Sequence, residues 1–392
     1  MISSCVDLPE ELEKNYRRPL ERAVGDIFVP GNNLRVLQNG IEIFPPMLEA
    51  INSAEEYVAL VTYVYWRGDI AGRFAEALAN AAERGVRTRV LLDSHGCRTM
   101  DDRHLQRMEN AGVEIRWFRP LATFRLWRID NRTHRKLLIC DNDTAFTGGV
   151  GIADEWDGDA RNPNEWRDTH VRVRGPAVRQ LHAAFMDNWC EAGDWEYDFT
   201  EGEPPFFEDG APVMTVRSDS TVDWTNIAMI VRTMIEIARS EISLTTAYLA
   251  PDPAMVRLLA KATKRGVRVR ILAPGPYTDS RLSQLAGGPA VETLLDAGVE
   301  VLWYQKTMLH AKVGIVDGCA SLIGSPNLNH RSMGKDEECC IVVLSPELAN
   351  QLGERFDADC RDAVELDAES WANRGGFRKF EERAARIIHE QL

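Results

Sequence analysis

The sequence predicts an α/β protein made of two similar α/β sandwich units, related by a pseudo-twofold axis with a site between them. Three observations predict this class: strands alternate with helices, landmarks recur along the chain, and the pattern H-x-K-x-x-x-x-D occurs once in each half. The chain has 392 residues, enough for two domains with separate cores. Hydrophobic residues make up 44% and charged residues 27%, a balance typical of globular proteins.

An internal repeat is the strongest sign of this organisation. ERGVRTRVLL at residues 83–92 returns as KRGVRVRILA at residues 264–273, and ENAGVEIRWF at residues 109–118 returns as LDAGVEVLWY at residues 295–304. The two H-x-K strings follow in the same order. We therefore expect two units that differ mainly by loop insertions.

The boundary between the units is predicted from an acidic stretch that contains proline and glycine. Residues 201–212, EGEPPFFEDGAP, form the expected linker. This places the first unit, with the first motif, at residues 1–205 and the second unit, with the second motif, at residues 213–392.

Within the first unit the elements can be assigned in order. Residues 57–66 are apolar and rich in β-forming side chains, which predicts a strand. Residues 71–85 have helical periodicity and end on Gly85, a signal for a helix C-terminus. The alternation continues with a strand, a helix and a strand at residues 86–92, 101–112 and 113–118. Such alternation favours a largely parallel sheet that helices cover on both faces.

The composition argues against several classes of protein. The formal charge of −14 makes nucleic acid an unlikely main partner. The N-terminal residues lack the apolar core of a signal peptide, and no window resembles a membrane span. The eight cysteines include no C-x-x-C pair, so we expect neither a disulfide framework nor a metal site.

The doubled motif supplies the candidate catalytic groups. Its members are His134, Lys136 and Asp141 in the first half, and His310, Lys312 and Asp317 in the second. In a predicted strand each histidine and its lysine project from one face. The aspartates fall in turn sequences at strand ends, where they either form the turn or brace a histidine of the other unit.

Small residues follow each aspartate at the same distance: Gly148 and Gly149 in the first half, Gly324 and Ser325 in the second. Such residues let backbone N–H groups approach an anion, and two lysines add positive charge. Two imidazoles can divide covalent catalysis, one attacking and the other protonating the leaving group. The set suits a phosphodiester and needs no metal.

These paired motifs resemble those of the phospholipase D superfamily, known as HKD motifs, over nearly the whole chain. GSPNLNHRSMGKDEE, residues 324–338, and EWRDTHVRVRGPAV, residues 165–178, are most similar to bacterial cardiolipin synthases and related phosphatidyltransferases, here without transmembrane segments. The resemblance implies the phospholipase D fold and a covalent phosphohistidine. It also implies that His134 is the nucleophile and His310 the general acid.

The chain departs from the family pattern in the first motif, where Gly149 and Gly151 replace serine and asparagine. The second motif keeps Ser325 and Asn327, which we expect to contact phosphate. Two carboxylates in equivalent places are candidates to orient the histidine rings or are ordinary strand-edge charges: Asp168 and Glu338.

Three segments could shape the substrate site. Residues 118–132 are basic and aromatic, include Arg125 and Trp127, and could meet a lipid surface or pack as an ordinary loop. The insert at residues 157–166 could add a wall, and His95 could lie near the cleft. The amphipathic C-terminal residues 377–392 are expected to dock on their own domain rather than on a bilayer.

The leading interpretation is a phosphatidyltransferase that transfers a phosphatidyl group between phospholipids. One alternative is a phospholipase D-type phosphodiesterase that hydrolyses phospholipid or nucleic acid, and another is an inactive membrane-surface binding protein. By the same resemblance we expect phosphatidylglycerol, then phosphatidylethanolamine, as substrates, and no cofactor. We expect a cytoplasmic protein held peripherally on the inner face of the cell membrane. The acceptor and the oligomeric state stay open.

Overall fold

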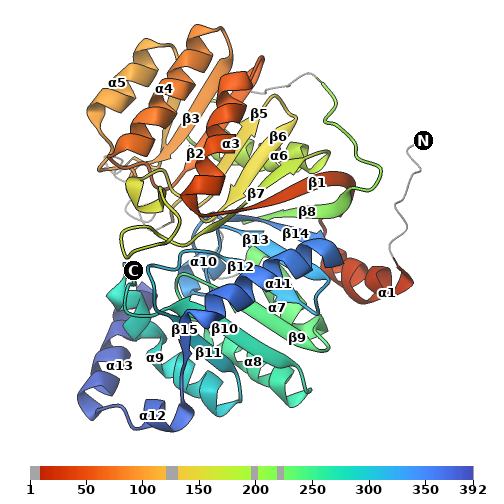
Figure 1. Ribbon diagram of the computed structural model, residues 1–392, viewed down its shortest axis with the longest axis vertical. Coiled ribbons are helices and arrows are strands. Elements are labelled where there is room, and N and C mark those ends of the chain that lie inside the picture. Colours follow the sequence, from red (N-terminus) through yellow and green to blue (C-terminus); the bar gives the residue numbers. More distant parts are fainter. Residues whose placement is uncertain (1–8, 121–130, 196–201, 219–224, 392) are drawn as a thin grey trace.

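The computed structural model describes residues 9–120, 131–195, 202–218 and 225–391 (Figure 1). Two α/β units lie one above the other in this view, and their sheets meet at the middle of the molecule. The two-unit α/β architecture predicted from the repeat is therefore present.

The first unit follows the predicted order of elements. Its strands are β1 (Val29–Gln38), β2 (Tyr57–Thr62), β3 (Arg87–Asp93), β4 (Glu114–Phe118), β5 (Leu137–Cys140), β6 (Thr144–Gly148) and β7 (Thr169–Arg174). Its helices are α3 (Asn39–Ser53), α4 (Asp69–Glu83), α5 (Asp102–Asn110), the short η3 (Asp154–Trp156) and α6 (Ala177–Glu191).

The second unit repeats this order and adds elements at its end. Its strands are β8 (Ala211–Arg217), β9 (Glu241–Thr245), β10 (Arg268–Pro274), β11 (Glu300–Tyr304), β12 (Val313–Val316), β13 (Ala320–Gly324), β14 (Cys339–Leu344) and β15 (Ala363–Glu365). Its helices are α7 (Asn226–Ile237), α8 (Pro253–Lys264), α9 (Arg281–Asp296), α10 (His330–Gly334), α11 (Pro346–Arg361), α12 (Ala368–Ala372) and α13 (Gly376–Gln391).

The sheet is mixed, which corrects the prediction of a largely parallel one. Only β2, β3 and β4, and likewise β9, β10 and β11, run parallel, whereas β5, β6 and β7 form an antiparallel meander. Short turns explain the difference, because β5 and β6 are joined by three residues, too few for a crossover helix. Asp141 and Asn142 in this turn have φ of 50° and 53°.

The pseudo-twofold relation appears in the strand order. Reading outward from the centre, the order is β1-β7-β6-β5-β2-β3-β4 in one unit and β8-β14-β13-β12-β9-β10-β11-β15 in the other. Antiparallel pairing of β1 with β8 joins the two sheets. A shared hydrophobic cluster also crosses the boundary and contains residues of both units, for example Val171 and Ile341. Sheet faces as well as edges therefore hold the units together.

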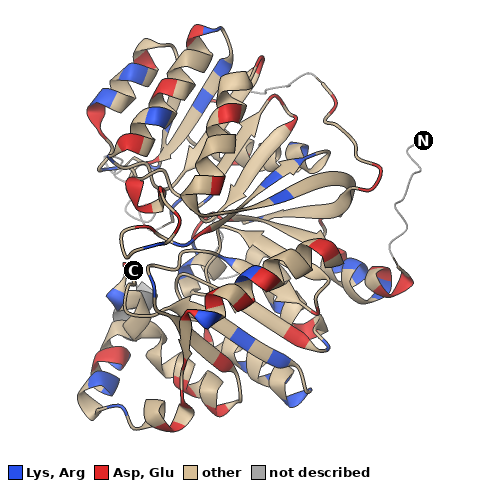
Figure 2. Ribbon diagram, in the orientation of Figure 1, with Lys and Arg blue, Asp and Glu red and all other residues tan. Residues whose placement is uncertain are grey.

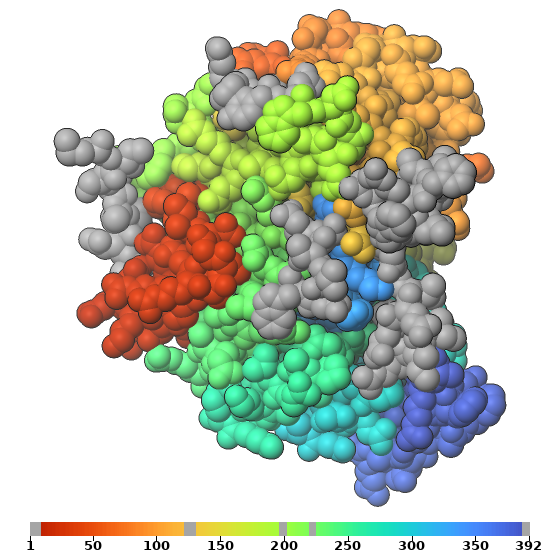
Figure 3. All heavy atoms as spheres, turned by 180° about the vertical axis from the view of Figure 1, so that it is seen from behind, coloured from red at the N-terminus to blue at the C-terminus, as the bar shows by residue number. Residues whose placement is uncertain are grey.

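The N-terminal helices lie against the second unit, although we assigned them to the first. α1 (Glu10–Leu12), the π-helical η1 (Glu13–Arg17) and α2 (Arg18–Val24) precede β1. Tyr16 and Leu20 belong to the buried cluster of the second unit. Figure 3 shows these red residues beside the green residues of the second unit. The N-terminal helices therefore cross the predicted boundary and pack against the second unit.

The C-terminal helix α13 packs on α9 of its own unit, as expected. Glu382 is buried there, pairs with Arg374 at 2.7 Å, and lies against Gly288, where a Cβ would come within 2.4 Å of it. Phe377 and Phe380, at the start of α13, remain 76% and 69% exposed. These two aromatic side chains of the predicted apolar face are therefore not used for docking.

Charged residues are spread over the outer helices, whereas most residues of the central strands are uncharged (Figure 2). Within the ranges given above, no helix combines the length and the apolar character needed to cross a bilayer.

Candidate active site

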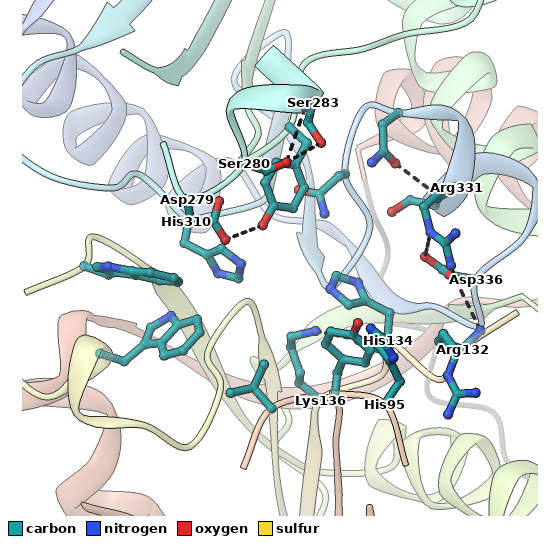
Figure 4. Close-up of a pocket in the computed structure, with 18 of the residues that line it drawn as sticks. His95, Arg132, His134, Lys136, Asp279, Ser280, Ser283, His310, Arg331 and Asp336 are labelled. Atoms are coloured by element: carbon teal, nitrogen blue, oxygen red, sulfur yellow. Dashed lines mark hydrogen bonds and ion pairs between the residues drawn. The ribbon is translucent and has the colours of Figure 1, made fainter. Parts of the chain in front are cut away.

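A cavity of about 650 Å³ lies where the two units meet, and it contains both motif histidines (Figure 4). Its lining residues are Tyr63, Val64, Trp66, His95, Arg132, His134, Lys136, Trp156, Trp166, Tyr248, Asp279, Ser280, Ser283, His310, Asn327, Asn329, Arg331, Ser332 and Asp336. Both units contribute side chains, so the site exists only when the units are assembled.

Backbone pairing between the units positions each histidine. The N–H of His134 donates to the carbonyl of Glu337 at 2.8 Å, and the N–H of His310 donates to the carbonyl of Arg167 at 2.7 Å. These bonds belong to two isolated bridges, Thr133 with Glu337 and Arg167 with Leu309. The histidines therefore precede β5 and β12 rather than lying within them, which corrects the strand assignment of the motif.

The same bridges bring a carboxylate of the opposite unit to each ring. His134 Nδ1 lies 2.9 Å from Oε1 of Glu338, and His310 Nδ1 lies 2.8 Å from Oδ2 of Asp168. Both carboxylates are completely buried. Because each acid occupies Nδ1, the Nε2 atom of each ring carries the lone pair in the neutral tautomer and is the nitrogen available for chemistry.

Each carboxylate is itself held by further donors. Glu338 accepts from Ser332 Oγ at 2.6 Å and from Ser325 Oγ. Asp168 accepts from Trp156 Nε1 at 2.8 Å. A Cβ on Gly149 would lie 2.3 Å from the Asp168 carboxylate, so glycine is needed there for packing. The exchange of serine for glycine in the first motif thus makes room for the acid that orients the other histidine.

Ser325 therefore has a different position from the one we expected. Its side chain is buried, does not line the cavity, and orients Glu338 rather than reaching toward phosphate. Asn327 does line the cavity, and its side-chain oxygen is buried without a hydrogen-bond partner. The N–H of Gly149 donates to Thr169, and the backbone of Gly148 packs on His170, so neither glycine is aimed at the cavity.

Burial controls the charge of the central groups. It lowers the pKa of His310 to about 3, with Lys312 adding to the effect and Asp168 opposing it. Burial also lowers the pKa of His134, of Lys136 to about 8 and of Lys312 to about 7. Both rings are consequently neutral near neutral pH. The two lysines titrate close to neutral pH.

Each lysine folds back toward its histidine. Lys136 Nζ donates to the carbonyl oxygen of His134 at 2.7 Å, and Lys312 Nζ lies 3.0 Å from Nε2 of His310. An anion between the two rings would therefore meet the Lys312 amine beside Nε2 of His310 and the Lys136 amine near the backbone of His134.

The motif aspartates lie away from the cavity. Asp141 accepts hydrogen bonds from the N–H groups of Glu55, Glu56 and Tyr57, each at 2.9 Å. Asp317 accepts from three N–H groups at residues 239–241 and from the Tyr16 hydroxyl. Neither aspartate contacts a histidine, so of the two alternatives the turn role holds. Their placement among the candidate catalytic groups is corrected. Asp141 holds the turn after β5 to the start of β2, and Asp317 holds the turn after β12 to the start of β9.

Aromatic side chains around the histidines were not found from the sequence. The rings of Trp156 and Trp166 lie 5.1 and 5.6 Å from that of His310, and the ring of Tyr63 lies 5.4 Å from that of His134. Trp156 directly precedes the insert that we expected to add a wall, and Trp166 is the last residue of that insert. A signal did exist for Tyr63, because it directly follows the carboxyl end of a strand in an α/β sheet, a common place for site residues.

Within the described ranges, no group of three or more histidine, cysteine or acidic side chains is placed to hold a metal ion. The arrangement suits two-histidine chemistry on an anion. One ring can attack, and the other can exchange a proton with the leaving or entering oxygen.

The fold and this site define a phospholipase D-like protein with one HKD motif per unit. Sequence comparison agrees: residues 47–183 and 231–360 match the family described as "Cardiolipin synthase, PLD-like domain". The chain belongs to this family.

Curated relatives extend the match beyond the family domain. "Probable cardiolipin synthase YwiE" of Bacillus subtilis is 32% identical over 368 residues, which cover 91% of this chain and 72% of that protein. "Cardiolipin synthase 1" of Bacillus cereus is 30% identical over 369 residues, with the same coverage.

Among solved structures, phosphatidylserine synthase of Haemophilus influenzae has a TM-score of 0.70 at 12% identity, covering 96% of this chain and 99% of that one. Polyphosphate kinase of Porphyromonas gingivalis has a TM-score of 0.58 at 13% identity, covering 100% of this chain and 57% of that one. At these identities the likeness concerns the fold.

Proposed function

We propose that the protein is a phosphatidyltransferase of the cardiolipin-synthase type, which moves a phosphatidyl group from one phospholipid to an alcohol on another. The observation that carries this proposal is the pair of histidines in one cavity, each held by a buried carboxylate of the other unit. The relatives named cardiolipin synthase supply the substrate class.

The first half-reaction forms a phosphohistidine. Nε2 of His134 attacks phosphorus, and the bond from phosphorus to the headgroup oxygen breaks. His310, protonated when the anionic substrate is bound, gives its proton to the departing oxygen. Lys136 and Lys312 stabilise the negative charge that develops on the phosphate oxygens, and the buried Glu338 stabilises the positive ring of His134.

The second half-reaction reverses these roles. The acceptor hydroxyl gives its proton to His310, its oxygen bonds to phosphorus, and the bond to His134 breaks. The identity of the acceptor decides the product. We propose that a second phosphatidylglycerol is the acceptor, so that cardiolipin and glycerol are formed, with phosphatidylethanolamine as the second candidate donor.

Both substrates are membrane lipids, so we propose that the protein works peripherally at a membrane surface, on the inner face. The basic and aromatic residues Arg125, Trp127 and Arg128, which we expected to meet lipid, lie outside the described residues. Pelleting with anionic vesicles tests the surface contact independently of catalysis, and loss of pelleting in a triple alanine variant at these positions is the expected result.

Product analysis tests the reaction. Purified protein is incubated with phosphatidylglycerol vesicles, and lipids are separated and identified by mass spectrometry. We expect cardiolipin as the main product, at a ratio to phosphatidic acid that rises with the phosphatidylglycerol content. Phosphatidic acid alone at every content would assign the protein to the hydrolases, and cleavage of plasmid DNA in a parallel tube would assign it to the nucleases.

A further inference from the structure

The two ends of the cavity differ in chemistry. Arg132, Arg331 and Asp336 gather beyond His134, on the side away from His310 (Figure 4). Asp279, Ser280 and Ser283 gather on the His310 side (Figure 4). Positively charged side chains dominate one end, whereas a carboxylate and two hydroxyl groups form the other.

This difference arises between equivalent loops. His95 follows β3 of the first unit, and Asp279 follows β10, the corresponding strand of the second. The N–H after each strand donates to the end of the next parallel strand, Ser94 to Phe118 and Gly275 to Tyr304, so the two loops begin in the same way. The pseudo-twofold axis would allow identical ends, and the catalytic steps shared by both histidines do not require them to differ.

The hydroxyl-rich end is connected to His310. The ring of Tyr248 lies 6.4 Å from that of His310, and its hydroxyl donates to Asp279 at 2.8 Å. Ser280 Oγ donates to Ser283 Oγ at 2.9 Å. Asp279 is exposed and lines the cavity, and a carboxylate offers about four acceptor positions. The Tyr248 hydroxyl and the backbone N–H groups of Asp279 and Ser280 act on this carboxylate, which leaves an acceptor position for a ligand.

From this arrangement we infer that Asp279, Ser280 and Ser283 form a subsite for an alcohol with more than one hydroxyl group, such as the glycerol moiety that leaves and enters beside His310. The inference rests on the proposed function, in which His310 exchanges its proton with that alcohol. It adds the residues that select the alcohol, which neither the doubled motif nor the relatives assign.

The geometry of displacement supports this placement. The nucleophile and the departing oxygen lie on opposite sides of phosphorus, so an alcohol that leaves from a phosphate on His134 lies toward His310. One hydroxyl then faces His310 Nε2. A neighbouring hydroxyl of the same molecule is within reach of the Asp279 carboxylate, and a monohydroxy alcohol would leave that acceptor without a partner.

An ammonium headgroup is the competing occupant of a carboxylate subsite. Two features favour a polyol. Lys312 already offsets part of the charge of Asp279, so a second cation there would be attracted less strongly than by an isolated carboxylate. The serine hydroxyl groups can both donate and accept, which matches another hydroxyl group better than an ammonium, which only donates.

Competition between small alcohols tests the subsite. Phosphatidylglycerol vesicles are incubated with the protein and equal concentrations of deuterated glycerol, 1-propanol and ethanolamine, and the three transfer products are quantified by mass spectrometry. For the unmodified protein we expect glycerol to exceed 1-propanol by about tenfold or more, since a hydrogen bond to a charged group contributes that much. An excess of the ethanolamine product would overturn the polyol assignment.

Variants then locate the selectivity. In Asp279→Ala we expect the ratio of glycerol to 1-propanol to fall toward one, and in Asp279→Asn, which keeps an oxygen, to fall part of the way. Ser283→Ala is the second variant, because it leaves the helix cap at Ser280 in place, and we expect a smaller fall in the ratio. Asp296→Asn, an exposed aspartate at the far end of α9, is the matched control with an unchanged ratio.

The outcomes separate this inference from the proposed function. If the unmodified protein transfers lipid to no alcohol and only hydrolyses it, the proposed function fails. If transfer occurs but Asp279→Ala and Ser283→Ala keep the original ratio, the subsite assignment alone is overturned.

Discussion

Replacing Glu338 by glutamine tests whether a carboxylate of one unit activates the histidine of the other. Glutamine keeps the size and can still accept from Ser332, but it removes the charge next to His134 Nδ1. Burial alone would raise the pKa of Glu338, yet the His134 ring, Lys136 and Ser325 hold it below its usual value. The native side chain is therefore an anion, and the change removes a full charge.

The expected loss follows from the geometry. The His134 ring becomes positive when phosphorus bonds to Nε2, and two unit charges about 4 Å apart interact by about 4 kcal/mol at an effective dielectric constant of about 20. The lost hydrogen bond to a charged group is included in this value. Since about 1.4 kcal/mol corresponds to a tenfold change in rate, kcat should fall by roughly 10² to 10³.

The assay is the initial rate of cardiolipin formation, with the thermal midpoint measured on the same preparations. The exposed Glu347, in the first turn of α11, supplies the matched variant Glu347→Gln, which should retain full activity. Nitrogen NMR of labelled histidine should show that the Nδ1 proton of His134 is no longer strongly favoured in Glu338→Gln. A folded variant with kcat within about threefold of the original would refute the reasoning.

Four further predictions concern the site and its supports. His134→Ala and His310→Ala should each lower the rate by at least about 10³, with the double variant scarcely worse, because the rings act as one unit; additive losses in the rate assay would contradict this. Exhaustive chelation should leave the rate unchanged, and a loss that one divalent ion restores would be the contrary result. Because burial lowers the pKa of Lys312 to about 7, its charge is lost as the pH rises, so kcat/KM for phosphatidylglycerol should fall above about pH 7; a flat profile would show that this charge is not needed. Asp317→Ala should lower the free energy of unfolding by about 1–3 kcal/mol, because three N–H groups and the Tyr16 hydroxyl lose a charged acceptor, and denaturant titration measures this; an unchanged midpoint would contradict the turn-holding role.

Local pattern predicted much of the fold. Apolar runs and helix-end signals placed β3, α4 and α5 within a few residues of their observed bounds, because these features depend on neighbours in the chain. The pairing of β5, β6 and β7 was missed. A short apolar strand has the same pattern in a parallel and an antiparallel neighbourhood, and only the turn length separates them.

The sequence by itself determined the doubled unit and the chemical groups of the site, because the motif repeats with its histidine, lysine and small residues in order. The tertiary structure alone decided which acid serves which ring. Glu338 lies 204 positions from His134, and Asp168 lies 142 positions from His310. It also moved Asp141 and Asp317 out of the cavity and brought Asp279 beside His310. These pairs of residues form when the two units pack together across the pseudo-twofold axis. The spacing of residues within one unit does not indicate which residue of the other unit will lie beside them.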